Sequence, residues 1–465
     1  MKKTLEVLGL VFVVIGGAMF GAMATAYGLG ALLTSSMRDG FLRAHLPAVS
    51  EALGRFVVPI INILILMLAF VMIIATLLTL AERKWSAMMQ DRLGPNRARF
   101  AIPGLSNRAL GGLPHVAADS VKMLFKEDFR PASANGFLFN LGPILAFAPV
   151  FALFAVVPAG PSVRILDVNV GMFISNPNFG VLYLFAVASL AVYGTSLAGW
   201  ASNNKFALLG GVRAASQMIS YEVALGLSLV GMMVAFSSVQ LPQMVELQAN
   251  WIWGGHGVVD MGLPAWGIFL QPLGFVIFFA AAFAETKRAP FDAPEGESEI
   301  IGYFVEYSGM KFGMFMISEF IEVVVLAAVS AVIFFGGYHL PFGEHFLHDQ
   351  LMNVGLLREN PSIRELLWGA SLGTFFWFKV LALCWVQLAI RWTFPRFRYD
   401  QIQTLGWKIL LPAGLLNLFL SAGLILWDSS LRTLTAVGLL EIGIVVALSL
   451  SKKEPTAIHL HPSSV

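Results

Sequence analysis

The chain has 465 residues, of which 57% are hydrophobic and only 12% charged, and its formal net charge is +2. With a mean hydropathy of +0.76, this composition excludes a soluble globular domain and predicts a membrane protein. The single cysteine, Cys384, excludes disulfides, cysteine-ligated iron–sulfur clusters and cysteine-rich zinc sites. The sequence lacks the glycine-rich motifs of nucleotide sites, so any electrons that it handles come from a partner.

Many apolar runs are long enough to cross a hydrocarbon core of about 30 Å, which predicts α-helices and not barrel strands. We therefore expect an all-α polytopic membrane protein with about ten transmembrane helices. In chain order, the expected spans are residues 8–30, 56–81, 139–159, 179–201, 217–237, 265–285, 312–337, 368–390, 409–427 and 433–450.

The first span follows Met1-Lys2-Lys3 and is also compatible with a cleaved signal peptide. Its apolar run is long for such a peptide, and Gly17 and Gly21 have the spacing of close helix packing. We therefore expect the first span to be retained as a transmembrane helix.

Basic residues predict the orientation of the spans. With Met1 in the cytoplasm, most Lys and Arg residues fall in cytoplasmic segments, as the positive-inside rule requires. The opposite loops hold only Arg38, Arg43, Arg55, Arg164, Arg358, Arg364 and Arg432. We expect a multi-pass protein of a bacterial inner (plasma) membrane, with its N- and C-termini in the cytoplasm.

The longest cytoplasmic segment is 82–138, which opens with Glu82-Arg83-Lys84. Gly94-Pro95-Asn96 predicts a turn, because proline fixes its own φ and disfavours helix at the residue before it. Residues 113–126 then predict a helix with one apolar side, formed by Val116, Val121, Met123, Leu124 and Phe125. This amphipathic stretch is too short to span, so it predicts a helix at the membrane surface, against lipid or a partner protein.

Carboxylates crowd the segment that follows the sixth span: Glu285, Asp292, Glu295, Glu297, Glu299 and Glu306. Pro290 and Pro294 interrupt any helix there and predict a loop. Burial raises the pKa of a carboxyl group and a nearby arginine lowers it, so such acids next to Arg288 are candidates for proton handling. The alternative is a solvated loop that Lys287 and Arg288 merely neutralise.

Ionisable residues also lie inside the expected spans. Glu222, Glu319 and Glu322 would each cost about 2.5–3.5 kcal/mol at the bilayer centre, so we expect them to face protein or water. For Glu222 the alternative is an interfacial ion pair with Arg213. Lys379 is either a proton-relay lysine or a partner of Glu441. Histidines on an outer loop (His339, His345 and His348, with Glu344) give only a weak metal signal, and we expect no metal site.

Four motifs follow one another along the chain. They are ERK-x-x-A-x-x-Q-x-R-x-GPN from Glu82, D-x-x-K-x-x-x-KE from Asp119, W-x-SNNK-x-x-x-x-G-x-x-R-x-x-x-Q-x-x-SYE from Trp200, and AET-x-RAPFD-x-PE-x-ESE-x-x-G-x-x-x-EYSG from Ala284. Together they resemble the quinone-site membrane subunit of respiratory complex I, which is called H in bacteria and subunit 1 in mitochondria. The resemblance covers residues 56–427. Lys287 departs from it, standing where relatives usually have Asn.

The resemblance implies an eight-helix core over residues 56–427. Residues 1–55 then add a transmembrane helix and outer loop, and residues 428–465 add a last helix and a cytoplasmic tail. It also implies a quinone tunnel that opens to lipid between the 56–81 helix, the amphipathic helix and the 312–337 helix.

The resemblance further implies roles for individual residues. Four residues are expected to line the quinone tunnel: Glu82, Arg83, Arg92 and Asp119. The residues expected to couple quinone reduction to proton movement are Glu222, Glu285, Arg288, Asp292, Glu295, Glu297, Glu299, Glu306 and Glu319. Quinone is a bound substrate shared with partner subunits, and no flavin, iron–sulfur cluster or metal is expected in this chain.

The function that the resemblance implies is a membrane subunit of a proton-translocating NADH:quinone oxidoreductase. The expected partners are quinone, lipid, the peripheral iron–sulfur and quinone-site subunits, the small membrane subunits and the antiporter-like subunits, with no nucleic acid. The alternatives are the homologous membrane subunit of an energy-converting hydrogenase, a stand-alone ion transporter, and a purely structural anchor.

Overall fold

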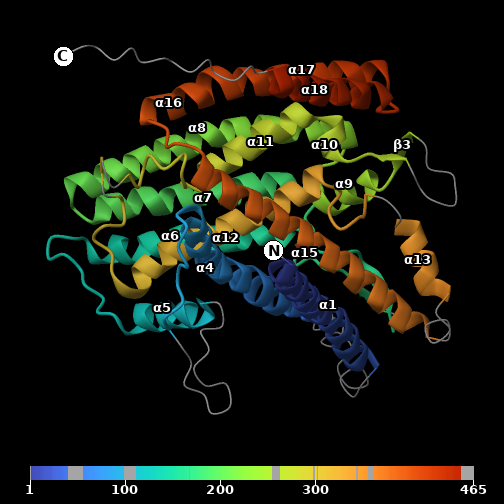
Figure 1. The fold of residues 1–465 in the computed structure, drawn as a ribbon, viewed down its shortest axis with the longest axis horizontal. Coiled ribbons are helices and arrows are strands. Elements are labelled where there is room, and N and C mark those ends of the chain that lie inside the picture. The colour runs from blue at the N-terminus through green and yellow to red at the C-terminus, as the bar shows by residue number, and fades with distance from the viewer. Residues whose placement is uncertain are drawn as a thin grey trace.

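The computed structural model describes residues 2–39, 56–98, 112–166, 168–253, 262–296, 299–300, 302–341, 344–353 and 360–451. Long helices lie side by side in a bundle, with α5 at one end of the molecule and α13 at the other (Figure 1). We refer to these ends as the α5 side and the α13 side. The protein is an all-α polytopic membrane protein, as predicted.

The first half of the chain builds six of the long helical segments. Their bounds are α1 Lys2–Asp39, the segment Phe56–Met89 that contains the π-helix η1 (Ile63–Val71) and α4 (Met72–Met89), α5 Leu113–Phe125, α6 Gly136–Leu153 followed by η3 (Phe154–Val156), α7 Gly180–Ala201, and α8 Lys205–Phe236. The α8 helix begins twelve residues before the predicted span at 217. It begins there because the side chain of Asn204 caps the helix by accepting a hydrogen bond from the Phe206 N–H.

The second half contains one broken span, four longer helical segments and two shorter helices. The bounds are α9 Leu241–Gln248, α10 Gly267–Leu270, α11 Pro272–Glu285, α12 Gly309–Phe334, α13 Glu344–Asn353, α15 Pro361–Thr393, α16 Tyr399–Thr404 with the π-helix η4 (Leu405–Leu410) and α17 (Leu411–Trp427), and α18 Arg432–Ser451. A helix overlaps each of the expected spans, but the sixth is divided between α10 and α11, and α18, which overlaps the last, is not among the candidate membrane spans of the described ranges. Within the described ranges, eight helices are long and apolar enough to cross a membrane, and Pro272–Glu285 is a shorter apolar helix.

Two small hairpins, which the sequence did not predict, lie among the connecting segments. Strands β1 (Val163–Ile165) and β2 (Val168–Val170) pair antiparallel, with Val163 opposite Val170. Strands β3 (Trp251–Trp253) and β4 (Leu263–Pro264) form the second pair. The Nδ2 of buried Asn62 donates to the carbonyl oxygens of Gly171 and Phe173, both at 2.8 Å, which ties the segment after β2 to the start of the η1 helix.

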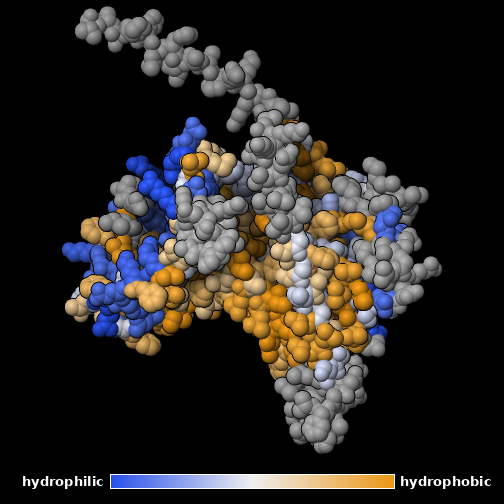
Figure 2. All heavy atoms as spheres, turned by 60° about the horizontal axis from the view of Figure 1, so that its bottom comes forward, coloured by the Kyte–Doolittle hydropathy of each residue, from blue (hydrophilic) through white to orange (hydrophobic). Residues whose placement is uncertain are grey.

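The α12 helix forms the centre of the bundle. In its most apolar window 94% of the residues are buried, whereas no other candidate span in the described ranges exceeds 50%. Hydrophobic residues cover much of the middle of the surface, and hydrophilic residues gather towards its left and right edges (Figure 2). This distribution is that of a protein whose outer helices face lipid and whose ends face water.

The helix α1 packs on glycines of α15, and not through its own Gly17 and Gly21, where a Cβ would have no atom within 4 Å. A Cβ at Gly373 would lie 2.1 Å from Cε of Met23, and one at Gly369 would lie 2.9 Å from the ring of Tyr27. The Tyr27 hydroxyl donates to the carbonyl of Pro161 at 2.7 Å. Small residues let helices approach closely in a bilayer, so α1 is a close-packed part of the bundle.

Candidate functional site

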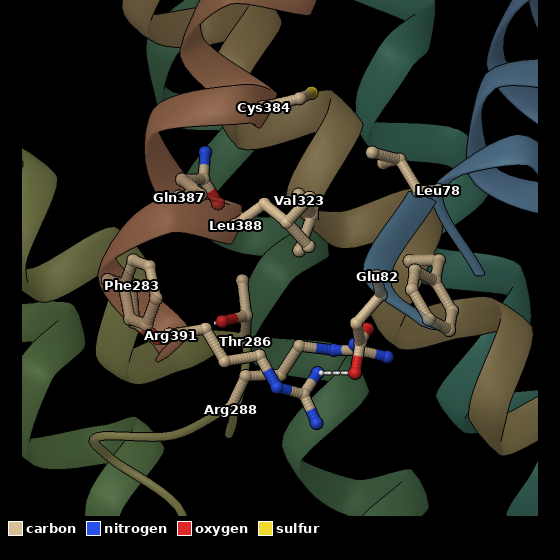
Figure 3. Close-up of a pocket in the computed structure, with 11 residues that line it drawn as sticks. Leu78, Glu82, Phe283, Thr286, Arg288, Val323, Cys384, Gln387, Leu388 and Arg391 are labelled. Atoms are coloured by element: carbon tan, nitrogen blue, oxygen red, sulfur yellow. Dashed lines mark hydrogen bonds and ion pairs between the residues drawn. The ribbon is translucent and has the colours of Figure 1, made fainter. Parts of the chain in front are cut away.

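Glu82, near the end of α4, is bound by two arginines from other elements. Arg288, in the loop after α11, donates from Nη1 to Glu82 at 2.7 Å, and Arg391, at the end of α15, approaches it at 2.9 Å. Figure 3 shows both guanidinium groups directed towards Glu82, with a dashed line marking an ion pair. The Nη2 of Arg288 also contacts Glu319 of α12 at 3.3 Å. One arginine thus joins α4 to α12.

A second buried ion pair lies beside the first. Lys287 Nζ is 3.4 Å from Glu322, and both side chains are almost fully buried. The guanidinium carbon of Arg288 lies 3.7 Å from the centroid of the Phe320 ring, which packs a cation against an aromatic face. Lys287 and Arg288 are 4% and 7% exposed, so the interpretation as a solvated, merely neutralised loop is wrong for this part of the segment.

Side chains from other elements hold the loop that carries these groups by donating hydrogen bonds to its backbone and to the end of α11. Nε2 of buried Gln217 donates to the carbonyls of Ala284 and Phe291, both at 2.7 Å. Arg396 donates to the carbonyl of Asp292 at 2.6 Å. As predicted, the described part of the segment from Lys287 to Ser308 is not helical.

Burial controls the protonation of the loop acids. It raises the pKa of Asp292 to about 6 despite the opposing effect of Arg396. It also raises the pKa of Glu295 well above its ordinary value, and the Glu319 carboxylate raises it further. For Lys287, burial lowers the pKa, but the carboxylates of Glu322, Glu319 and Glu295 outweigh that effect and the net pKa lies above its ordinary value. These acids therefore retain protons more readily than exposed acids, while Lys287 stays a cation.

Glu295 and Glu319 lie within hydrogen-bonding reach of each other. Oε1 of each has no hydrogen-bond partner in the part of the chain that the structure describes. Buried polar atoms are normally satisfied by protein or ordered water, and the raised pKa of Glu295 favours a protonated carboxyl group that can donate a hydrogen bond. Tyr303, whose pKa is raised by burial and then by Glu319 and Glu295, lies beside the same pair.

The ionisable groups continue from this cluster towards α8. Glu285, at the end of α11, is buried and interacts electrostatically with Glu322 on one side and Glu222 on the other. Glu222 accepts a hydrogen bond from the Ser189 hydroxyl of α7. The series Glu82, Arg288, Glu319, Glu322, Glu285 and Glu222 therefore connects α4 to α8 through the interior.

An apolar pocket of about 360 Å³ lies between α4, α5 and α12. Its wall includes four methionines and Phe320 and, at one end, Glu82, Arg83 and Asp119; the methionines are Met72, Met123, Met310 and Met316. Its volume falls in the range of about 300–1,000 Å³ typical of small-molecule sites. Leu124 and Met310 line it and are also exposed, so the pocket adjoins the hydrophobic surface.

Two further cavities share residues with this pocket. A recess of about 410 Å³ is lined by Glu82, Arg83, Arg92 and Trp392, among others. A water-sized cavity of about 20 Å³ lies above Arg288 and Arg391 and is lined by Glu82, Phe320 and Cys384 (Figure 3). Glu82 therefore borders all three spaces.

Some predicted site residues lie outside the buried cluster. Asp119 pairs with Arg83 at 2.5 Å, across the pocket between α5 and α4. Arg92 is exposed and bonds Gln90. Two acids make contacts nearer the surface: Glu299 pairs with Arg213 at 2.8 Å and Glu306 accepts from Asn204 at 2.7 Å. Glu297 lies outside the described residues.

Two pairings considered from the sequence are wrong. Glu222 does not pair with Arg213, because Arg213 reaches Glu299. Lys379 does not pair with Glu441, because its Nζ donates to the backbone carbonyls of Phe335, Gly337 and His339 at the end of α12.

On the α13 side, His339 Nδ1 lies 3.0 Å from Glu344. Within the described ranges, no group of three or more histidine, cysteine or acidic residues has a metal-binding arrangement.

Known proteins share the sequence that builds this site. The family described as NADH dehydrogenase matches residues 61–422. The chain belongs to this family. The H 1 subunit of the NADH-quinone oxidoreductase of Cytophaga hutchinsonii is 40% identical over 358 residues, which are 76% of this chain and 93% of that relative. Subunit 8 of the Rhodothermus marinus enzyme is 41% identical over 362 residues, covering 77% and 95%.

A third NADH dehydrogenase relative, the H subunit of the Syntrophotalea carbinolica NADH-quinone oxidoreductase, is 39% identical over 363 residues, covering 78% of this chain and 94% of the relative. The matched residues 61–422 contain α4, α5, α12, α15 and the loop after α11, and thus the whole ionic cluster and the pocket. Helices α1 and α18 lie outside them.

Sequence reasoning missed three residues of this site. Arg391 gives no signal in the sequence beyond its place as a basic residue at the end of a span, although it binds Glu82. Tyr303 and Gln217 stand within the four motifs, but the residue type alone did not show that one contacts Glu319 and the other holds the loop. The departure of Lys287 from the family pattern was the available signal for its pairing with Glu322.

Proposed function

We propose that this chain is the quinone-site membrane subunit of a proton-translocating NADH:quinone oxidoreductase. The observation that carries the proposal is the meeting of two features at Glu82. An apolar pocket of ligand size adjoins the hydrophobic surface, and it ends at a buried, interconnected group of ionisable side chains. The relatives that match this chain are named as subunits of NADH-quinone oxidoreductase.

The pocket between α4, α5 and α12 suits the isoprenoid tail of a quinone. Its methionines are flexible, polarizable side chains that adapt to an irregular apolar ligand. Arg83 and Asp119 border the path of the ligand, and the recess beyond Glu82 leads past Arg92 to the surface on the α5 side. We propose that partner subunits cover this recess and bring the electrons there.

The ionic cluster suits the response to quinone reduction. Taking up two electrons without protons leaves negative charge on the quinone, and nearby carboxylic acids respond by changing their protonation. Glu82 lines the pocket and Arg288 binds Glu82, and Glu295, whose raised pKa favours its protonated form, lies beside Glu319 behind them. Glu285 and Glu222 extend the series towards the far side of the subunit.

We further propose that the α5 side faces the cytoplasm of a bacterial cell, with both termini on that side, because the basic loops lie there. Residues 56–427 form the functional core, and residues 1–55 and 428–465 are additions to it. Peripheral iron–sulfur subunits, small membrane subunits and antiporter-like subunits complete the enzyme.

Replacing Arg83 tests the proposal. In membranes that contain the assembled enzyme, Arg83→Ala should lower the quinone reductase rate about tenfold, because a charged hydrogen-bonding group at the ligand path is lost. Lys205→Ala is the matched control, since Lys205 is exposed at the start of α8 and borders neither pocket nor cluster.

The rate is measured with NADH and with an artificial acceptor that bypasses quinone. A loss with quinone alone, at normal assembly and with an unchanged Lys205→Ala control, supports the proposal. An unchanged quinone rate in the assembled Arg83→Ala enzyme would contradict a quinone path along α4.

A further inference from the structure

The sixth predicted span, residues 265–285, is broken at Gln271. The short helix α10 ends at Leu270, Gln271 has non-helical backbone angles of φ −143° and ψ 72°, and α11 begins at Pro272. A helix that begins inside a bilayer exposes backbone N–H groups that lipid cannot satisfy, at a cost of several kcal/mol each.

The local sequence reduces the number of unsatisfied groups at this break. Pro272 has no N–H, and the Phe275 N–H bonds the carbonyl of Gln271 at 3.0 Å. The Leu273 N–H has a different acceptor, Oε2 of Glu441, at 3.3 Å. Glu441 belongs to α18, which lies outside the residues matched by the family.

The helix α18 is packed tightly enough to hold that carboxylate in place. A Cβ on Gly438 would lie 2.2 Å from the carbonyl oxygen of Phe269, so the α18 backbone lies directly against α10. Leu434 and Thr435 are buried on the same helix. A carboxylate at the N-terminus of α11 is also favoured by the dipole of that helix.

From this contact α11 runs without interruption to Glu285, a length of about 20 Å for its 14 residues. Glu285 joins the ionic cluster at the other end, and Lys287 and Arg288 follow it after Thr286. The position of α11 along its axis therefore sets where these three side chains lie.

We propose that Glu441 is a positioning residue of this enzyme: its carboxylate caps the broken end of α11 and so holds Glu285 and the Lys287–Arg288 pair in register with α12. The consequence for catalysis rests on the proposed function, whereas the cap itself does not. A helix outside the residues matched by the family thus supplies the acceptor on which the central site depends.

The test compares Glu441→Leu, which removes the acceptor, with Glu441→Gln, which keeps one, in the assembled enzyme in nanodiscs. Hydrogen–deuterium exchange of peptides that cover residues 271–276 reports the cap directly. Quinone reductase rate and protons moved per electron report its effect on the site. Leu440→Ala, at the adjacent exposed residue, is the control.

We expect Glu441→Leu to speed exchange at residues 271–276 about tenfold and to lower the quinone rate several-fold, with Glu441→Gln and Leu440→Ala close to the unmodified enzyme in both. Unchanged exchange in Glu441→Leu would overturn the cap. Faster hydrogen exchange in Glu441→Leu with an unchanged quinone reductase rate would overturn the positioning role. So would a Glu441→Gln enzyme whose quinone reductase rate is as low as that of Glu441→Leu.

If Glu441→Leu does not assemble, Glu441→Asp tests the cap in its place. Aspartate keeps the carboxylate, but its side chain is one methylene shorter, so the carboxylate lies farther from the Leu273 N–H. Intermediate exchange supports the cap, and exchange equal to that of the unmodified enzyme overturns it. The two proposals can fail separately. If the Glu441 variant exchanges faster but Arg83→Ala keeps the full quinone reductase rate, the cap is upheld and the proposed function is contradicted.

Discussion

At the scale of single residues, Arg288 determines how the cluster holds together. Its two terminal nitrogens bind carboxylates on different helices, Glu82 of α4 and Glu319 of α12. Arginine suits this task because its planar fork binds two carboxylates at once, whereas lysine offers a single point charge. Arg391 binds Glu82 as well, but it is more exposed.

We therefore expect Arg288→Gln to destabilise the protein by about 3–5 kcal/mol, the cost of leaving buried charges unpaired. Arg398→Gln, at a side chain that is 76% exposed, should have no measurable effect. The difference is measured by heating the purified enzyme and recording the temperature at which this subunit is lost from the complex. Equal unfolding temperatures in the two variants would show that Arg288 does not hold α4 and α12 together.

Asp292 should make stability depend on pH. Its pKa is raised from the usual 3.8 to about 6, chiefly by burial, so the native state binds this proton more tightly than the unfolded chain does. The resulting stabilisation is fully present below about pH 4 and is lost as pH rises through about 6.

Asp292→Asn should remove this component and flatten the dependence of the unfolding temperature on pH between about 4 and 6. The measurement is a series of thermal unfolding curves at constant ionic strength. An Asp292→Asn protein with the same pH slope as the unmodified protein would assign the slope to another group. Asp400→Asn, at a side chain that is 71% exposed, is the control.

At the scale of elements, α12 borders both parts of the site, the apolar pocket and the ionic cluster. One of its faces presents Gly313, Met316 and Phe320 to the pocket, and another presents Glu319 and Glu322 to the ionic cluster. Phe320 borders both regions, with the Arg288 guanidinium on its ring. A ligand in the pocket thus contacts the same helix that holds the acids.

Filling the pocket from α12 should compete with a long quinone tail. A Cβ at Gly313 meets only Met123 atoms at 3.7–3.8 Å, so Gly313→Leu fits the backbone but extends into the pocket. We expect the KM for a long-tailed quinone to rise about tenfold, with a smaller change for a short-tailed analogue. The matched control is Gly423→Leu, because a Cβ there has no atom within 4 Å.

Steady-state rates with the two quinones measure the effect. An equal change in KM for both would argue that Gly313 acts on the headgroup or on the fold and not on the tail. Unchanged kinetics for both would remove the pocket from the quinone path.

Elements were easier to predict from the sequence than contacts. Length and hydropathy determine where the chain crosses lipid, so the spans and the amphipathic helix α5 were foreseen. The start of α8 was missed because a single capping side chain, Asn204, extends the helix beyond its apolar run. The break at Gln271 was missed although Gln271-Pro272 signals it, because one polar residue and one proline barely lower the mean hydropathy of the span.

The membership of the ionic cluster depended on pairings between residues far apart in sequence. Glu82 meets Arg288 and Arg391 only because α4, the loop after α11 and α15 converge. Arg288 follows Glu285 by three residues, and beyond the end of α11 its side chain reaches Glu82 and Glu319. The sequence around a residue does not tell which distant residue it will pair with; only resemblance to a family gives that information.

At the scale of the whole molecule, the orientation in the membrane follows from the distribution of basic residues. We expect both termini to lie in the cytoplasm. Green fluorescent protein fused after Val465 should fluoresce, and alkaline phosphatase at the same place should be inactive. Alkaline phosphatase fused after Asn353, in an outer segment, should be active; the reverse pattern would invert the protein and place the ionic cluster on the other side.

The near-complete enclosure of α12 also bears on how the enzyme responds to its lipids. Helices that touch lipid tilt or shift when the bilayer thickens or thins. The depth of α12 is set by its protein neighbours, since 94% of its apolar window is covered by them. Glu319 and Glu322 should therefore keep their level across bacterial membranes of different acyl-chain length, while the outer helices adjust around them.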